Sequence, residues 1–210
     1  MIPDPRLCAI LSEADGKVLC DVGTDHGYIA VGALLKGKAE RVVAADVSEK
    51  CLAKCVALAR EKGVESRLKA VVSDGFSEID DDIDVAVIAG LGGYETIKIL
   101  KNAEILGRVP EKLVLCPHQN AKELRAYLKN YCIEKDYVVK SGTKFYPVIV
   151  ALKGGDGYRD EELEFGKNMP PTHDFDEMIS TRKRVLEERF SGREMPDAVR
   201  REYEEILRLC

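Results

Sequence analysis

The chain has 210 residues, enough for one α/β domain with a smaller appendage, because single domains usually run to about 100–200 residues. Its formal net charge of −5 argues against a protein held on nucleic acid by overall positive charge, although it allows a local basic face. The seven cysteines show neither a Cys-x-x-Cys pair nor a zinc-ligand spacing, and no signal peptide or long apolar span is present. These features favour a cytoplasmic protein without a bound metal or a membrane partner.

Short apolar runs alternate with longer stretches of helical period over residues 18–152, a pattern typical of a parallel sheet covered by helices. The predicted strands are 18–22, 41–46, 68–73, 84–90 and 112–116. Their apolar runs suggest that the strands are buried on both faces. The predicted helices are 27–36, 49–62, 94–102 and 121–130.

The pattern changes after residue 130. The runs 133–140 and 146–153 are separated only by Ser-Gly-Thr-Lys-Phe, which is too short for a parallel crossover. We therefore expect an antiparallel hairpin that completes a mostly parallel, seven-stranded sheet.

A Gly-rich acidic stretch at 154–163 predicts a domain boundary, which divides the chain into residues 1–154 and 155–210. Apolar residues at three and four spacing over 175–190 and 196–209 predict a C-terminal helical hairpin. Such a pair buries little surface by itself, so it is expected to pack on the main domain.

The first strand leads into a turn with two glycines. One acidic residue lies between the glycines, and another precedes them. A dinucleotide-binding turn has the pattern G-x-G-x-x-G, so that a pyrophosphate lies against the start of the helix. Here Gly23 and Gly27 enclose Asp25, which would repel a pyrophosphate, and Asp21 precedes them. The two carboxylates instead favour a ligand that carries an ammonium or a sulfonium group, and a capped turn with solvated acids is the alternative.

Two further acids stand at the ends of the second and third strands. A carboxylate at the position of Asp46 can bind ribose hydroxyls, as in many nucleoside-binding folds. Asp74 is followed by Gly75, which suits either an adenine amino group or a plain Asp-Gly turn. Together with Asp21, these strand ends predict a pocket for a nucleoside with positive charge rather than phosphates.

The motifs DVGTDHGY (21–28), VVAADVS (42–48), VVSDG (71–75) and VIAGLGG (87–93) are similar to those of class I S-adenosylmethionine (SAM) methyltransferases. More narrowly, they resemble the bacterial TrmK family, the tRNA methyltransferases that modify N1 of adenine 22. The first family motif is matched at every position, and the family's Ala-Gly-Met-Gly-Gly is matched with Leu91 in place of Met. The likeness covers about residues 6–154 and implies a Rossmann-like α/β fold with a coiled-coil-like C-terminal appendage.

The resemblance also implies a site. SAM, released as S-adenosylhomocysteine, is expected to contact Asp21, Gly23, Asp25, Gly27, Asp46, Val47, Ser73, Asp74, Gly75, Ala89 and Gly90. The target base is expected to contact Gly92, Gly93, Pro117 and His118 and to enter beside Tyr28. After the fifth strand the family usually carries Gln-Pro-Asn, whereas this chain has Cys116, Pro117 and His118.

Methylation of adenine N1 needs no strong base, because the ring nitrogen has its own lone pair, but the product ring becomes cationic. Asp25 is the first candidate to stabilise that charge. His26 is expected to orient the base or to be structural, and Tyr28 to stack on the base or to pack in the core.

The expected function is methylation of N1 of adenine 22 in tRNA. The alternatives are methylation of another RNA or a small molecule, an NAD-binding oxidoreductase, and a non-catalytic RNA-binding module. A set of basic residues either forms an RNA-binding face or is simply solvated. These residues are Lys98, Lys101, Arg108, Lys112, Lys122, Arg125, Lys129, Arg182, Lys183, Arg184, Arg189 and Arg193. The sequence specifies no oligomeric state.

Overall fold

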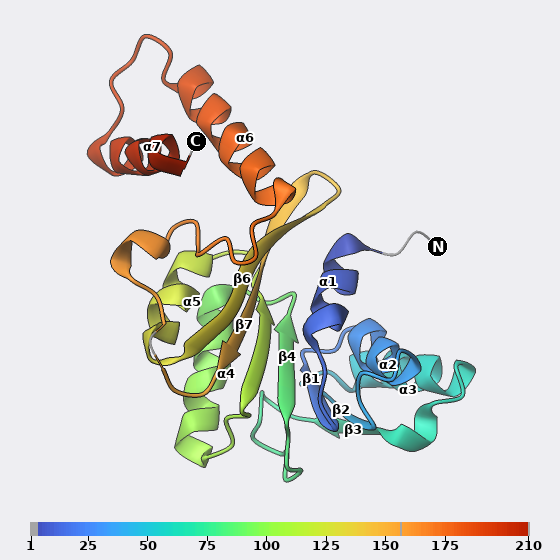
Figure 1. Cartoon of the computed structure of the whole chain (residues 1–210). Helices are drawn as coiled ribbons and strands as arrows, with labels where there is room; N and C mark the ends of the chain where they lie inside the picture. The colour runs from blue at the N-terminus through green and yellow to red at the C-terminus, as the bar shows by residue number, and fades with distance from the viewer. Residues whose placement is uncertain (1–3, 156, 210) are drawn as a thin grey trace.

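The computed structural model describes residues 4–155 and 157–209. Its strands are β1 (Val18–Val22), β2 (Arg41–Asp46), β3 (Leu68–Val72), β4 (Val85–Ala89), β5 (Lys112–Cys116), β6 (Cys132–Ser141) and β7 (Lys144–Leu152). Within the described residues they form one sheet in the order β3-β2-β1-β4-β5-β7-β6, and β7 runs antiparallel to both of its neighbours (Figure 1). The predicted mostly parallel sheet with a terminal antiparallel hairpin is confirmed.

The edge strand β3 departs from the predicted burial. Four strands, β1, β2, β4 and β5, are largely buried, as expected for the interior of a parallel sheet. In β3, however, Lys69, Ala70 and Val72 are exposed. The prediction of burial on both faces is wrong for this strand, because β3 pairs with β2 alone and lies at the margin of the sheet.

Helices cover both faces of the sheet. They are α1 (Pro5–Glu13), α2 (Tyr28–Leu35), α3 (Glu49–Glu61), α4 (Gly93–Leu106), α5 (Ala121–Tyr127), α6 (His173–Arg189) and α7 (Asp197–Leu209). One core contains Leu34 of α2 and Cys55 of α3, and the other contains Leu100 of α4 and Leu124 of α5. The two cores lie on opposite faces of the sheet, with α1, α2 and α3 on one side and α4 and α5 on the other (Figure 1).

Helix α1 was not predicted, although its start carries a recognisable signal. The Asp4 carboxylate caps the helix by accepting a hydrogen bond from the Arg6 backbone N–H at 2.9 Å, and Pro5 occupies the first helical position. Ile10 and Leu11 are buried in the core shared with α2 and α3. The N-terminal helix therefore closes one face of the sheet and brings its own first turn to the end of the strands.

The C-terminal helices pack on each other and on the terminal hairpin, as expected. Phe175 and Ile179 of α6 and Ile206 of α7 share a third core with Val138 of β6. In Figure 1 the pair stands beyond the end of the hairpin, apart from the helices that cover the sheet. Within the described residues, no helix has the length and the apolar composition to cross a membrane.

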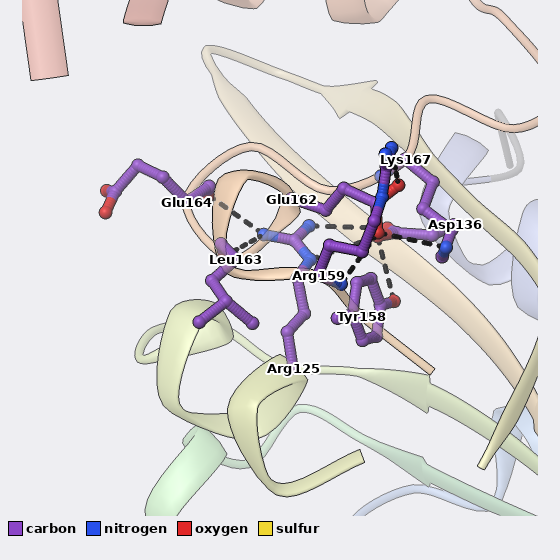
Figure 2. A network of polar contacts seen from close by, with 8 residues as sticks. All are labelled: Arg125, Asp136, Tyr158, Arg159, Glu162, Leu163, Glu164 and Lys167. Atoms are coloured by element: carbon purple, nitrogen blue, oxygen red, sulfur yellow. Dashed lines mark hydrogen bonds and ion pairs between the residues drawn. The ribbon is translucent and has the colours of Figure 1, made fainter. Parts of the chain in front are cut away.

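Arg125 was expected at the surface, either on an RNA-binding face or solvated, and both expectations are wrong because it is buried. Its side chain is 3% exposed, and its Nε donates a hydrogen bond to Asp136 Oδ2 at 3.0 Å. Its Nη1 donates to the backbone carbonyls of Leu163 and Glu164 at 3.2 and 2.9 Å, and the Tyr158 hydroxyl donates to the same Asp136 carboxylate at 2.9 Å. Figure 2 shows this buried network, which fixes the segment after β7 to α5 and β6.

The proposed boundary at residue 154 stays a prediction. Asp156, in the stretch expected to link two domains, and residues 1–3 lie outside the described residues. The buried side chains of Tyr158 and Phe165 bind the beginning of the second unit to the hairpin and to the core beneath it.

Candidate functional site

A pocket of about 480 Å³ opens at the carboxyl ends of β1, β2 and β4. The chain order of the strands reverses between β1 and β4, which is where ligands bind in sheets of this kind. We call it the strand-tip pocket, and its lining residues are Asp4, Arg6, Leu7, Asp21, Gly23, Thr24, Asp25, His26, Gly27, Tyr28, Ile29, Asp46, Ala89, Gly90, Leu91 and His118.

Asp21 is the buried acid of the strand-tip pocket. Its side chain lies on β1 and accepts a hydrogen bond from the backbone N–H of Ala30, in the first turn of α2, at 3.2 Å. Burial, with a smaller contribution from the charge of Asp46, raises the pKa of Asp21 to about 6. A carboxyl group in this state gains stabilisation when a positive charge arrives, so it favours a cationic ligand.

Gly23 and Gly27 allow the turn between β1 and α2 to take its shape. Gly23 has φ +81°, in the left-handed region that glycine adopts without strain. Gly27 has φ +73°, and a Cβ there would lie 2.5 Å from Cys55 Sγ and 2.8 Å from Cys55 Cα. Gly27 is therefore required for the close packing of this turn against α3.

Three residues of the same turn form the outer rim. Asp25 Oδ1 is 3.2 Å from Lys54 Nζ and accepts from Cys51 Sγ at 3.4 Å, while its Oδ2 lies 3.2 Å from His26 Nε2. The hydrogen bonds from Lys54 and Cys51 lower the pKa of Asp25, so this carboxylate stays ionised. The rings of His26 and Tyr28 stack with centroids 5.5 Å apart, and Tyr28 is 50% exposed, which excludes the core position considered for it.

The acids at the strand ends do not all reach the same pocket. Asp46 lines the strand-tip pocket, and its Oδ1 accepts a hydrogen bond from the Ser48 backbone N–H at 2.7 Å, which fixes the carboxylate. Asp74 lies in a separate pocket along α4, 3.7 Å from Lys98 Nζ. Val47, Ser73 and Gly75 do not line the strand-tip pocket either, so their cofactor contacts stay predictions.

The floor of the pocket comes from the turn after β4. Ala89 and Gly90 line it as expected, whereas Gly92, Gly93 and Pro117 do not. The backbone N–H of Gly93 donates to the Gln119 carbonyl at 2.8 Å, and a Cβ on Gly93 would lie 2.1 Å from the Asn120 carbonyl oxygen. In this structure Gly93 lets α4 pack closely on the turn after β5. The base contacts expected for Gly92, Gly93 and Pro117 stay predictions.

His118, the predicted residue that departs from the family motif, does line the pocket and has partners that the sequence did not reveal. Its Nε2 contacts the Nη1 of Arg6, which comes from α1. The Arg6 guanidinium carbon lies 5.0 Å from the Tyr146 ring centroid, and the His118 and Tyr146 rings are 5.4 Å apart. Arg6, His118 and Tyr146 thus form a cluster of mutual contacts. The Asp-Pro helix start before Arg6 was the available signal for its position.

The charge of the strand-tip pocket is predominantly negative. Among the described lining residues, four are carboxylates and one, Arg6, is a permanent cation. A pyrophosphate would meet this negative field directly, whereas a nucleoside with an ammonium or a sulfonium group would be attracted. The geometry therefore disfavours the dinucleotide alternative.

A family described as Methyltransferase domain matches residues 4–149, which is more than half of the chain and includes every element that lines the pocket. The chain belongs to this methyltransferase family. A curated relative, the tRNA (adenine(22)-N(1))-methyltransferase of Bacillus subtilis (strain 168), is 27% identical over 143 residues, covering 67% of this chain and 60% of that protein. The chain spans about 60% of the length of the curated relatives that it matches.

Solved structures resemble the methyltransferase along nearly its whole length. Streptococcus pneumoniae Sp1610 in complex with S-adenosyl-L-methionine has a TM-score of 0.86 and 24% identity, and the match covers 99% of each chain. The M. capricolum TrmK structure in complex with S-adenosyl-homocysteine has a TM-score of 0.80 and 21% identity over 99% of this chain and 94% of that one. At these identities the likeness establishes the fold, including the C-terminal helical pair.

Proposed function

We propose that the chain transfers a methyl group from SAM to N1 of adenine 22 in tRNA. The observation that carries the proposal is the acidic strand-tip pocket of a methyltransferase domain, in which the phosphate-binding position holds Asp25. The name of the Bacillus subtilis relative supports the choice of tRNA and of the base, and the SAM and S-adenosyl-homocysteine bound to the structural relatives support the cofactor.

The lining residues fit this cofactor chemically. The fixed carboxylate of Asp46 supplies an acceptor for ribose hydroxyls, and the buried Asp21 lies where a positive charge is favoured. Asp74 does not line this pocket; its contact with the adenine is proposed from the family resemblance alone, and in this structure its carboxylate lies 3.7 Å from Lys98 Nζ. When bound, SAM supplies an electrophilic methyl group on a sulfonium.

The residues of the outer rim, Asp25, His26 and Tyr28, act on the acceptor base. The N1 lone pair forms the new N–C bond as the C–S bond breaks, the electron pair of that bond stays on sulfur, and the adenine ring gains a positive charge. The ionised Asp25 stabilises this charge, and the stacked rings of His26 and Tyr28 orient the base at the mouth of the pocket. Because N1 takes part in Watson–Crick pairing, the base must leave any helix before it reacts.

A tRNA substrate places the protein in the cytoplasm, where unmodified tRNA is found. The free thiols of the six described cysteines, Cys8, Cys20, Cys51, Cys55, Cys116 and Cys132, fit such a reducing compartment.

The test is nucleoside analysis after incubation of the protein with SAM and unmodified tRNA. We expect 1-methyladenosine, mapped to position 22, and none without SAM. Absence of 1-methyladenosine contradicts the proposal. Stabilisation against heat by S-adenosylhomocysteine but not by NAD is expected as well, and the reverse would favour the oxidoreductase.

A second candidate is methylation of another RNA or of a small molecule. It is favoured by His118, which stands where the family usually carries the Asn of Gln-Pro-Asn. Transfer of labelled methyl groups to total RNA but not to tRNA would support this candidate over the first.

A further inference from the structure

The guanidinium of Arg6 is held on three sides. Its Nη2 lies 3.6 Å from Asp4 Oδ2, its plane covers the Tyr146 ring at 5.0 Å, and its Nη1 contacts His118 Nε2. These partners come from α1, β7 and the turn after β5, which are far apart in the sequence. The arginine side chain therefore has a defined orientation at the edge of the strand-tip pocket.

The contact with Arg6 favours one uncharged tautomer of His118. A guanidinium only donates hydrogen bonds, so His118 Nε2 must accept, and the single ring proton lies on Nδ1. The charged groups that face the ring are Arg6 from α1, with Asp4 behind it, and Lys144 from β7. Partial burial, with the charges of Arg6 and Lys144, lowers the pKa of His118, which agrees with an uncharged ring.

His118 stands between two cavities. Besides the strand-tip pocket it lines a groove of about 610 Å³ between the β6–β7 hairpin and α6. A Cβ on Gly90, in the pocket floor, would lie 3.9 Å from His118 Cε1. The ring is thus adjacent to the floor and exposed to anything that enters the pocket from the side of the hairpin.

We propose that Arg6 is a positioning residue for methyl transfer: its hydrogen bond to Nε2 holds His118 fixed and uncharged at the entrance of the strand-tip pocket, where His118 contacts the acceptor base. The inference rests on the proposed function, because it assumes a base that becomes cationic on methylation. An imidazolium here would add a second positive charge beside that of Arg6 and increase the repulsion of the developing charge, whereas a neutral ring offers a hydrogen bond without that addition.

The first experiment titrates the histidines of the ligand-free protein by NMR. The chain has three histidines, so the spectrum of His118→Asn identifies the resonance of His118. In Arg6→Gln, we expect the pKa of His118 to rise toward the ordinary value of about 6.5. Arg41→Gln removes an exposed arginine from β2 and should leave the titration unchanged. An unchanged pKa in Arg6→Gln overturns the inference.

The second experiment separates positioning from cofactor binding. For Arg6→Gln with tRNA we expect kcat to fall by about 10- to 100-fold with the KM for SAM unchanged, as for a misplaced contact near the reaction. The deficit should deepen as the pH is lowered from 7.5 to 6, and Arg6→Lys should restore part of the rate. A raised KM for SAM with unchanged kcat would instead make Arg6 a cofactor ligand and overturn the inference.

The titration and the kinetic measurement test separate claims, so their outcomes are independent. If the wild-type protein methylates no tRNA, the proposed function fails, while the titration still tests whether Arg6 keeps His118 uncharged. Thermal unfolding and circular dichroism of Arg6→Gln, compared with Arg41→Gln, show whether α1 stays folded.

Discussion

Asp21, near the end of β1, and Asp25, in the turn that follows, lie four residues apart and experience opposite environments. Asp21 is buried beneath the start of α2, where the charged form is disfavoured, whereas Asp25 is exposed and held by Lys54. The pKa of Asp21 is consequently raised to about 6 and that of Asp25 is lowered. Asp25 is the permanently charged member of the pair, and Asp21 is the member that responds to pH.

The buried carboxyl of Asp21 predicts a specific pH dependence of stability. Between about pH 4 and 6 the unfolded state loses its Asp21 proton while the folded state keeps it, so stability falls as pH rises through this window. The loss is at most about 3 kcal/mol, given the raised pKa of about 6. Urea unfolding at pH 4.5, 5.5 and 6.5 should show wild type losing stability relative to Asp21→Asn. The exposed-site variant Asp82→Asn keeps Asp21 and should lose stability in parallel with wild type.

Substitutions at Asp46 and Asp25 should separate binding from turnover. Asp46→Ala removes the fixed acceptor at the tip of β2, so we expect weaker SAM binding by calorimetry. Asp25→Ala should lower kcat more than SAM affinity, because it removes the charge proposed to stabilise the cationic product. Lys54→Gln, which removes a partner of Asp25 but keeps the carboxylate, is the control. An intact rate in Asp25→Ala would contradict the charge-stabilising role.

Most of the helices and strands were predictable because apolar runs and helical spacing are local properties. Helix α4 extends to Leu106, beyond the expected end at 102, since its apolar spacing continues to Gly107, the left-handed C-cap. The exposure of β3 depends on which strand lies beside it, and the burial of Arg125 depends on a segment about 40 residues later. Both are tertiary properties that no local pattern contains.

The site was predictable to a similar degree. The acids and glycines of the β1–α2 turn were found because one motif brings them together. Arg6 and Tyr146, in contrast, reach His118 from α1 and β7, and only the folded chain makes them neighbours.

The buried pair of Arg125 and Asp136 predicts a large loss of stability when one partner is removed. Arg125→Met leaves the Asp136 carboxylate buried without its countercharge, which typically costs about 3–5 kcal/mol. Urea unfolding measures the difference, and adding Asp136→Leu should restore much of it. Lys129→Met breaks an exposed, solvent-screened ion pair with Asp160 and should cost far less. Equal losses in the two single variants would contradict the assignment.

Across the whole molecule, many basic side chains of the predicted RNA-binding face are paired with carboxylates within the described residues. In the C-terminal pair, Arg182 is bonded to Glu202 and Arg184 lies 3.8 Å from Glu188. Along 4–155 and 157–209, Arg189 and Arg193 are exposed and form no ion pair. With a net charge of −5, the proposed RNA binding must rely on local contacts.

The double variant Arg189→Gln/Arg193→Gln tests whether the C-terminal pair contacts tRNA. We expect weaker tRNA binding and a plot of log affinity against log salt that is less steep by about 1–2, because each lost phosphate contact reduces the slope by about 1. SAM affinity should not change. Arg60→Gln/Lys62→Gln makes the same change in charge at the end of α3 and serves as the control. Equal slopes in both double variants would place the tRNA elsewhere.

The attachment of α1 to the terminal hairpin also constrains how the protein matures on the ribosome. Glu13 Oε2 lies 2.8 Å from Lys135 Nζ, and the Ser141 hydroxyl donates to Asp4 Oδ1 at 2.7 Å. Helix α1 therefore completes these contacts only after partners more than 120 residues later have been synthesised. The contact of Ser141 with Asp4, beside Arg6 at the edge of the pocket, can form only after residue 141 has left the exit tunnel, so this side of the pocket is completed late in translation.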